Sequence, residues 1–196
     1  MKTLSIFLIL VLTLAFAVAA NAEGTVFGIK AGVNFANISG DDTDDLNSLT
    51  GFAGGGFVDI AMSPTISIQP EIFYSQKGAK FNEEGTEISV KLDYIDVPVL
   101  FKYTMAGENA RPYFLFGPSI GFSINSELSA DDQSVELDNV ASTDFGLVFG
   151  FGVNFQKFLI EGRYGLGLSD IIDENTPEDD GSINNTTFQI MAGYSF

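Results

Sequence analysis

The sequence contains no cysteine, no histidine and no tryptophan, and it has only nine basic residues against 26 acidic ones. Without cysteine no disulfide can form, so stability must come from the fold and its surroundings. Without histidine or cysteine there is no Ser–His or Cys–His nucleophile pair, and the commonest metal ligand is missing. The net charge of −17 argues against nucleic acid as a partner, which would require a basic surface. We therefore expect no enzymatic activity and no cofactor.

The first 22 residues have the pattern of a secretory signal peptide. Lys2 supplies a positive charge, residues 4–18 form an apolar run, and Ala20-Asn21-Ala22 is a small-x-small cleavage site. The run is short for a membrane-spanning helix, although an uncleaved N-terminal anchor is the alternative. We expect residues 1–22 to be a cleaved signal peptide and residues 23–196 to form one outer-membrane β-barrel domain.

Eight segments of the remaining chain alternate apolar and polar residues, which is the period of a β-strand. The clearest is Phe145 to Phe155, where large apolar residues alternate mainly with glycine. The connections between the segments alternate short and long. The sequence therefore predicts an all-β fold, an eight-stranded antiparallel up-and-down transmembrane barrel. The segments cover residues 25–38, 51–61, 65–77, 88–103, 111–125, 144–155, 158–168 and 187–196.

Some features are irregular for such strands. The apolar residues of 88–103 lie at even positions up to Tyr94 and at odd positions from Ile95, which predicts a β-bulge. Pro70, Pro98 and Pro118 fall within proposed strands, where they cannot donate to the ladder. We expect these prolines to occupy bulges, or the strands to be shorter. The glycine-rich segment 51–61 leaves its facing ambiguous.

The composition of the two faces indicates which one is outside. The polar face consists mostly of Gly, Ser and Asn, which suits the crowded interior of an eight-stranded barrel. The apolar face carries many of the 19 phenylalanines and would promote aggregation in water. We therefore expect the apolar face to contact lipid. The alternative is a secreted, soluble, lipocalin-like barrel with this facing inverted and an apolar ligand inside.

Loop lengths predict the orientation of the barrel. Short connections are expected at 62–64, 106–107 and 156–157, and long ones at 39–50, 78–87, 126–140 and 170–185. Most of the acidic residues lie in the long connections. Short turns of such barrels face the periplasm and long loops face outward, so both termini are expected in the periplasm and the acidic segments outside the cell.

Five motifs along the chain resemble those of one family. They are Gly28-x-Lys30-x-Gly32-x-Asn34, Pro70-Glu71-x-x-Tyr74-Ser75-x-Lys77-Gly78, Tyr94-Ile95-x-Val97-Pro98, Pro112-Tyr113-x-x-x-Gly117-Pro118 and Glu161-x-Arg163-Tyr164. With these motifs the chain is similar to the PorT-like outer-membrane β-barrel proteins of Bacteroidetes, and the likeness covers nearly all of residues 23–196. It implies an eight-stranded barrel in the bacterial outer membrane, without carrying over the founding member's link to secretion. Resemblance to outer-membrane barrels in general implies that Phe196 helps the barrel assembly machinery to bind the chain.

Two groups of charged residues are candidate sites. Glu161 and Arg163 share a strand face, and we expect them to form a structural charge network in the lumen with Lys30, Glu71, Lys102 and Asp144, since buried charges must be paired. The alternative is a narrow, charge-lined pore. The second group offers oxygen ligands for Ca²⁺ or Mg²⁺ without matching an EF-hand, and its alternative is a solvated, self-repelling loop. It consists of Asp41, Asp42, Asp44, Asp45, Asp179 and Asp180.

Together these features predict a non-catalytic, integral outer-membrane protein with a scaffold or interaction role. Its expected partners are outer-membrane lipid, the barrel assembly machinery during biogenesis and a protein that binds the acidic loops. The alternatives are a narrow small-solute channel, an accessory of transport or secretion, and the soluble lipocalin-like barrel described above.

Overall fold

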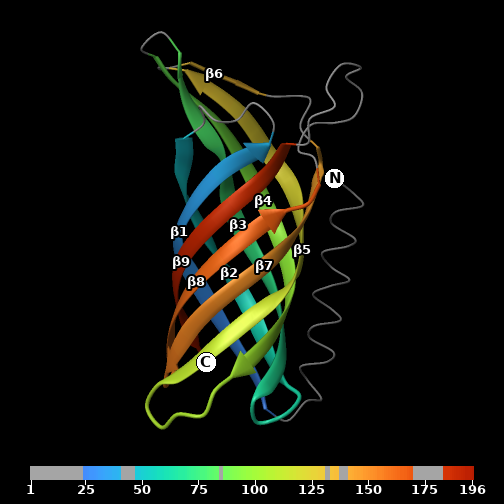
Figure 1. Cartoon of the computed structure of the whole chain (residues 1–196), viewed down its shortest axis with the longest axis vertical. Coiled ribbons are helices and arrows are strands. Elements are labelled where there is room, and N and C mark those ends of the chain that lie inside the picture. Colours follow the sequence, from blue (N-terminus) through green and yellow to red (C-terminus); the bar gives the residue numbers. More distant parts are fainter. Residues whose placement is uncertain (1–23, 41–46, 84–85, 131–132, 137–140, 170–182) are drawn as a thin grey trace.

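The computed structural model describes residues 24–40, 47–83, 86–130, 133–136, 141–169 and 183–196, and all regular structure in these residues is β (Figure 1). No helix in this part of the chain is long and apolar enough to cross a membrane. The strands are β1 (Thr25–Gly40), β2 (Asn47–Ala61), β3 (Ile66–Glu83), β4 (Thr86–Thr104), β5 (Arg111–Ala130), β6 (Gln133–Glu136), β7 (Thr143–Phe155), β8 (Phe158–Gly167) and β9 (Ile183–Ser195).

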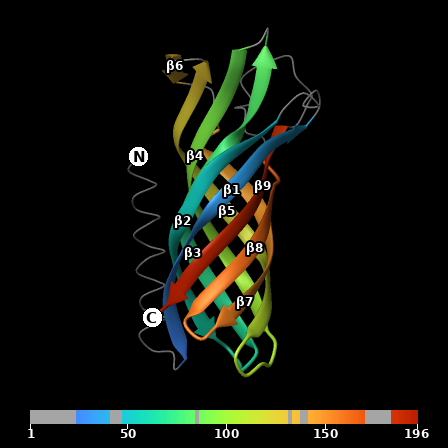
Figure 2. The same cartoon turned by 90° about the vertical axis from the view of Figure 1, so that its left-hand side faces the viewer.

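Eight of these strands form a closed antiparallel barrel, as the sequence predicts. Each strand pairs with its neighbour in the chain, β5 pairs with β7, and β1 pairs with β9 to close the barrel. The short strand β6 lies outside this circuit and pairs only with the far end of β5 (Figure 2). The expectation of one long connection over 126–140 was therefore wrong, because β5 continues to Ala130 and β6 folds back on it.

The two ends of the barrel differ. The short β2–β3, β4–β5 and β7–β8 connections and the C-terminus lie at one end, called here the lower end (Figure 1). The strands extend past the predicted limits toward the opposite, upper end. β3 reaches Glu83 and β4 starts at Thr86, so most of the expected 78–87 loop is strand.

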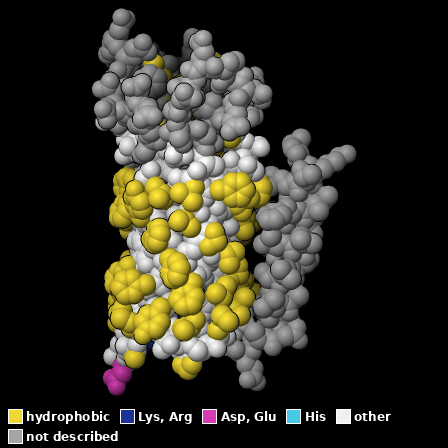
Figure 3. All heavy atoms as spheres, turned by 45° about the vertical axis from the view of Figure 1, so that its right-hand side comes forward, with side chains coloured by type: hydrophobic (Ala, Val, Ile, Leu, Met, Phe, Trp, Pro, Cys, Tyr) yellow, Lys and Arg dark blue, Asp and Glu magenta, His cyan; other side chains and the backbone are white. Residues whose placement is uncertain are grey.

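Most of the large apolar side chains of the barrel wall point outward, as expected for contact with lipid. Phe149, Phe151 and Ile190 are about half exposed, and apolar side chains cover the wall in Figure 3. Glycines facing the lumen leave room for the few aromatic rings inside. A Cβ atom on Gly28 would lie 2.2 Å from the Phe57 ring, and one on Gly152 would lie 2.4 Å from the Tyr113 ring. This facing excludes the soluble-barrel alternative, whose apolar residues would lie inside.

In β4 the apolar residues move from even to odd positions after Tyr94, but the strand does not reverse its facing there. Even-numbered residues point into the lumen along the whole stretch, so Leu92, Tyr94 and Lys102 are all buried there. The apolar residues instead move from the lumenal face to the outer face after Tyr94. A register shift does occur at Asp93/Tyr94, but the extra residue, Ile124, belongs to β5.

Above this level the lumen contains a small apolar core, called here the upper cluster. It consists of the buried residues Ile38, Ala79, Leu92 and Tyr94 with Val90 packed against them. The outward neighbours at the same level include the polar residues Thr50 and Lys91, beside the exposed Ile124. In the upper part of the barrel, apolar residues thus lie in the lumen, as they do in a water-soluble barrel.

None of the three prolines lies at a bulge and none shortens its strand, so that expectation was wrong. Pro70 lies at an interruption of β2–β3 pairing, Pro98 of β3–β4 pairing and Pro118 of β4–β5 pairing. Pairing resumes in the same register beyond each interruption. Each proline remains paired with the strand on its other side, opposite Val99, Ser119 and Leu147 respectively. The missing N–H therefore opens the ladder on one side only.

Candidate functional site: two charged layers in the barrel lumen

Four buried charges from three strands meet in the middle of the lumen. Lys30 of β1 contacts Glu71 of β3 at 3.0 Å and Glu161 of β8 at 2.9 Å, measured from Nζ to the carboxylate oxygens. The guanidinium of Arg163 makes two parallel bonds to Glu71, of 2.6 and 2.7 Å, and its Nε contacts Glu161. The Tyr113 hydroxyl donates to Glu161 at 2.7 Å. These five residues are called here the central layer.

Glycine on neighbouring strands makes this arrangement sterically feasible. Lys30 faces Gly193 of β9, where a Cβ atom would lie 2.9 Å from the lysine Cγ. Arg163 faces Gly150 of β7, where a Cβ atom would lie 3.2 Å from the arginine Cγ. Long charged side chains can therefore cross the lumen at a level where their neighbours occupy almost no space.

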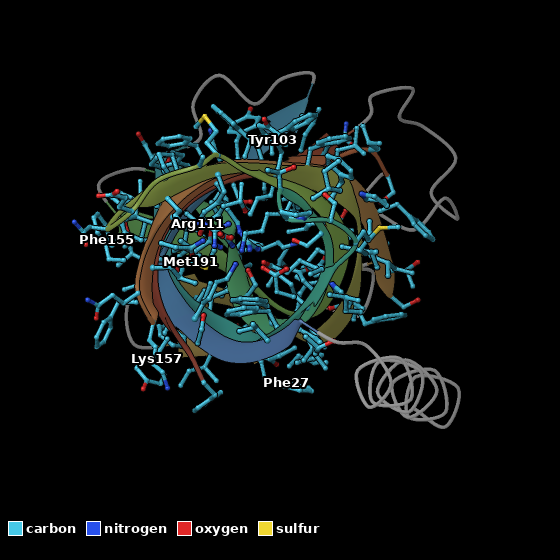
Figure 4. All side chains as sticks on the ribbon, turned by 90° about the horizontal axis from the view of Figure 1, so that it is seen from below. Phe27, Tyr103, Arg111, Phe155, Lys157 and Met191 are labelled. Carbon is cyan, nitrogen blue, oxygen red and sulfur yellow. The ribbon has the colours of Figure 1, made fainter. Side chains whose placement is uncertain are left out.

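A further ion pair lies below the central layer. Lys102 Nζ is 2.6 Å from Asp59 and 3.0 Å from the Gln69 carbonyl oxygen, and Gln69 in turn donates to Glu71. Beneath this pair the lumen widens into a cavity of about 450 Å³ that opens at the lower end. Arg111 lines the cavity, and its side chain lies within the barrel outline seen from below (Figure 4).

A second group of charges, called here the upper layer, lies between the central layer and the upper cluster. Lys77 Nζ is 3.0 Å from Asp96 and 3.1 Å from Asp144. Asn185 donates to Asp144 at 3.0 Å, and the Ser169 hydroxyl donates to the other oxygen of Asp144 at 3.2 Å. Lys77, Asp96, Asp144 and Asn185 make up this layer.

Each buried lumenal cation also lies over an aromatic ring. The distances from the charge to the ring centroid are 4.8 Å for Lys30, 4.5 Å for Lys77, 4.4 Å for Lys102 and 5.4 Å for Arg163, and the rings are those of Phe57, Tyr94, Tyr113 and Phe73. Cation–π attraction adds to the ion pairs in such desolvated positions. The inward aromatic residues therefore fill the lumen and stabilise its charges together.

The six residues expected in one lumenal network fall into two groups. Lys30, Glu71, Glu161 and Arg163 meet in the central layer, and Lys102 reaches it through Gln69. Asp144 lies apart, in the upper layer.

Sequence reasoning missed Lys77, Asp96 and Asp59. Lys77 shares a face with Glu71, because six positions separate them on one strand, so the strand period could have identified it. Asp59 and Asp96 lie on the two strands whose facing the sequence left ambiguous. Their pairing could not be read without the register between strands.

The two layers differ in charge balance. The central layer and the pair below it combine Lys30, Lys102 and Arg163 with three carboxylates, so the formal charges cancel. The upper layer has one lysine for two carboxylates. Between the layers lies a cavity of about 50 Å³, lined by Lys77, Asp96 and Asp144 on one side and by Arg163 on the other.

The remaining candidates lie elsewhere. Phe196 is exposed at the lower end, where its N–H donates to the Phe27 carbonyl at 2.9 Å and its ring meets Tyr194 edge-on. In the described part of the chain, no group of three or more acidic residues is placed to hold a metal ion. The proposed Ca²⁺ or Mg²⁺ ligands lie outside the described residues, and these are Asp41, Asp42, Asp44, Asp45, Asp179 and Asp180.

Comparison with known proteins gives one family and several similar folds. The model of the outer membrane protein β-barrel domain family matches residues 20–173. Comparison with curated sequences gives no match. Among solved structures, neisserial surface protein A is 14% identical, with 89% of this chain and 100% of that chain covered and a TM-score of 0.50. Ail, the attachment invasion locus protein of Yersinia pestis, is 19% identical, with 89% and 99% covered and a TM-score of 0.46.

Proposed function

The chain belongs to the outer membrane protein β-barrel domain family, and from this premise we propose that it acts as a non-catalytic scaffold or interaction protein of the bacterial outer membrane. Its outer wall contacts lipid, and its loops at the upper end provide the surface for a protein partner. Catalysis plays no part in this proposal, because the buried carboxylates of the lumen are all engaged by lysine, arginine, tyrosine or amide groups.

The closed lumen is the observation that carries this proposal. Side chains from β1, β3 and β8 cross the middle of the barrel and bind one another, and the central-layer charges are at most 4% exposed. A solute channel would require these groups to face water along a continuous path. Buried, mutually satisfied ion pairs instead fix the strands around a filled interior.

Conductance across planar bilayers tests the closed lumen. We expect the purified, folded protein to produce no discrete channels under conditions in which a general porin conducts. Reproducible single-channel steps from the wild-type protein would contradict the proposal and favour the narrow charge-lined pore.

We further propose that the chain is a PorT-like protein within the broader family. The supporting observation is spatial, because motifs spread along the sequence converge in the lumen. Lys30, Glu71, Tyr113 and Glu161-x-Arg163 come from four separate motifs and build the central layer. A role as a secretion accessory is tested by deleting the gene and measuring secreted proteins. Unchanged secretion would exclude that role and retain the scaffold role.

The orientation and processing of the chain complete the proposal. Residues 1–22 act as a cleaved signal peptide, residues 23–196 form the barrel domain, and both termini face the periplasm. We expect intact-mass measurement of the purified protein to give a chain that begins at Glu23. Protease added to whole cells should cut near Asp41 or Asp179 and spare Lys157, and cleavage at Lys157 alone would reverse the orientation.

Acidic segments at the outer surface are the proposed contact for the protein partner, and their carboxylates are also the proposed ligands for Ca²⁺ or Mg²⁺. Calorimetric titration of the folded protein with calcium chloride tests the second role. Replacing Asp41, Asp42, Asp44 and Asp45 by asparagine should reduce the heat of binding, and unchanged heat would indicate a solvated loop without a metal.

A further inference from the structure

The cavity at the lower end of the lumen, called here the lower cavity, is closed on its inner side. The paired Lys102 and Asp59 lie above it, and the filled central layer lies above them. A molecule can therefore enter and leave only at the lower end, which faces the periplasm in the proposed orientation. The volume of about 450 Å³ lies within the range of about 300–1,000 Å³ that is typical of small-molecule sites.

The wall of the lower cavity is polar. Hydroxyl and amide side chains make up much of it, and no aromatic ring is among the described residues that line it. Two acidic and two basic side chains also line it, so their formal charges cancel. These four residues are Asp59, Lys102, Glu108 and Arg111. The cavity thus suits a polar molecule better than an apolar one, because an apolar molecule would leave these groups without hydrogen bonds.

Arg111 is the cation of this wall that no described carboxylate binds. Lys102 is held by Asp59 and Gln69, whereas the Arg111 guanidinium makes one bond of 3.4 Å, to the Pro64 carbonyl oxygen. Its side chain lies within the barrel outline in Figure 4. A guanidinium carries five N–H donors, so most of those of Arg111 are available to a molecule in the cavity.

The register between strands places other hydrogen-bonding side chains beside Arg111. Asn154 of β7 lies directly opposite Arg111 of β5, and both line the cavity. Thr104 of β4 lies opposite Tyr113, two positions along β5 from Arg111, and Ser67 lies on the next strand, β3. Diagonal neighbours on one face of a sheet are about 7–8 Å apart, which long side chains can span. One ligand can therefore contact several of these groups.

Two hydroxyl groups of this patch are buried without a partner in the described part of the chain. Ser67 is 7% exposed and Thr104 is 9% exposed, and neither hydroxyl makes a hydrogen bond to a described residue. Buried hydroxyl groups are normally hydrogen-bonded. Both side chains line the lower cavity, so a molecule inside it must supply the partner. Water does so until a ligand with the same hydrogen-bonding groups replaces it.

We propose that the lower cavity binds a small hydroxylated anion, a sugar acid or a sugar phosphate, whose charged group contacts Arg111. The planar fork of a guanidinium fits two oxygens of a carboxylate or a phosphate. Ser67, Thr104 and Asn154 bind the hydroxyl groups of the ligand, because hydroxyl and amide side chains both donate and accept. This site goes beyond the scaffold role and does not depend on it.

NMR titration of the folded, full-length mature protein in a non-ionic detergent tests the proposal with three probes of one ring type. Glucuronate carries a carboxylate, glucose 6-phosphate carries a phosphate, and glucose carries neither. We expect saturable shifts of the Thr104 and Asn154 amide signals with at least one anion, and binding about ten-fold or more tighter than that of glucose. The tighter anion identifies the charged group. No saturable shift with either anion would overturn the proposal, as would equal binding of glucose.

Three variants make the test specific, and an unchanged Tm shows that each remains folded. Arg111→Met removes the guanidinium and should weaken binding of the anions about ten-fold or more. Thr104→Val removes a hydroxyl but keeps the shape of the side chain, and it should weaken binding of the anions and of glucose alike. Lys157→Met removes an exposed cation at the same end that does not line the cavity, and it should leave binding unchanged. Undiminished binding to Arg111→Met, or an equal loss in Lys157→Met, would overturn the proposal.

Discussion

Strand β4 passes through two regions of the barrel that differ in which face, outer or lumenal, carries the apolar side chains. Between Ile95 and Tyr103 its odd-numbered apolar residues lie on the outer face. The lumen beside them holds charged and polar groups together with one small apolar cluster of Leu100, Tyr113 and Leu115. Between Val90 and Tyr94 its apolar residues point inward and its outer face carries Lys91 and Asp93. The backbone continues as one strand, so the difference comes from the solvent outside it.

The reversal of facing along β4 is what we expect where the hydrocarbon of the membrane ends. Lipid stabilises outward phenylalanine and forces polar groups into the lumen, where they must bind one another. Water reverses both preferences, so an ordinary apolar core forms inside the strands above that level. We infer that the boundary lies between Asp93 and Ile95 on β4, close to the upper charged layer.

The largest effect should follow from breaking the central layer. Arg163→Met leaves Glu71 and Glu161 buried with a single lysine, and we expect it to lower the free energy of unfolding by about 3–5 kcal/mol. Chemical unfolding in detergent micelles measures this change. Arg111→Met is the matched control, because Arg111 is exposed and its guanidinium makes one long bond, of 3.4 Å. Equal effects of the two variants would show that the central layer contributes no special stability.

A charge on the lipid face should lower the free energy of unfolding somewhat less than Arg163→Met does. Phe149→Arg places a cation on the outer wall of β7, and we expect a loss of about 2–4 kcal/mol if the residue lies near the membrane midplane. The same unfolding measurement applies, in lipid vesicles rather than micelles. Ser48→Arg, on the exposed upper part of β2, should change stability by no more than about 0.5 kcal/mol. A neutral Phe149→Arg would contradict the assigned facing.

The upper cluster should behave as a small soluble core. Leu92→Ala removes a side chain that is 1% exposed, and we expect a loss of about 2 kcal/mol, the lower end of the range for buried leucine. Thr50→Ala, on the outer face, serves as the control and should change stability by no more than about 0.5 kcal/mol. If both variants were neutral, the inward apolar residues would not form a packed core.

The smallest effect on stability is expected at the C-terminus. Phe196→Ala should leave the unfolding free energy of the refolded barrel almost unchanged, because the residue is 69% exposed and its backbone bond to Phe27 remains. The amount of assembled barrel in cells should fall. Phe158→Ala removes a similarly exposed phenylalanine from the same end and should leave assembly unchanged. Equal assembly of the two variants would remove the proposed signal role from Phe196.

Strict alternation made the membrane part of this fold predictable from sequence. The phenylalanines of β7 and the even-numbered apolar residues of β8 and β9 could be assigned to one face from their period, and the small polar residues opposite them indicated that this face is outside. Leu159 and Met191 are exceptions, because both are buried in the lumen. Glu161 and Arg163 could likewise be assigned to the lumen. In these strands the outer face contacts one solvent along most of its length, so the pattern and the facing correspond at most positions.

The upper part could not be predicted in the same way. The inward residues Leu92 and Tyr94 are apolar there. The shift of apolar residues from even to odd positions was therefore interpreted as a β-bulge, although we attribute it to a change of solvent outside the strand. In β2, glycines on both faces concealed that Phe57 and Asp59 point inward. The pairing of Lys77 with Asp96 and Asp144 depends on the register among β3, β4 and β7, which no local pattern records.

The change of solvent along β4 can be measured directly with spin labels, since the chain contains no native cysteine that would react. Single cysteines at Lys91, Val99 and Tyr103, all exposed on the outer face, would carry the label in lipid bilayers. We predict that oxygen dissolved in the lipid broadens the signals at Val99 and Tyr103, whereas a water-soluble nickel chelate broadens the signal at Lys91. Nickel access at Val99, or access at Lys91 to oxygen alone, would contradict the placement of the membrane boundary between Asp93 and Ile95.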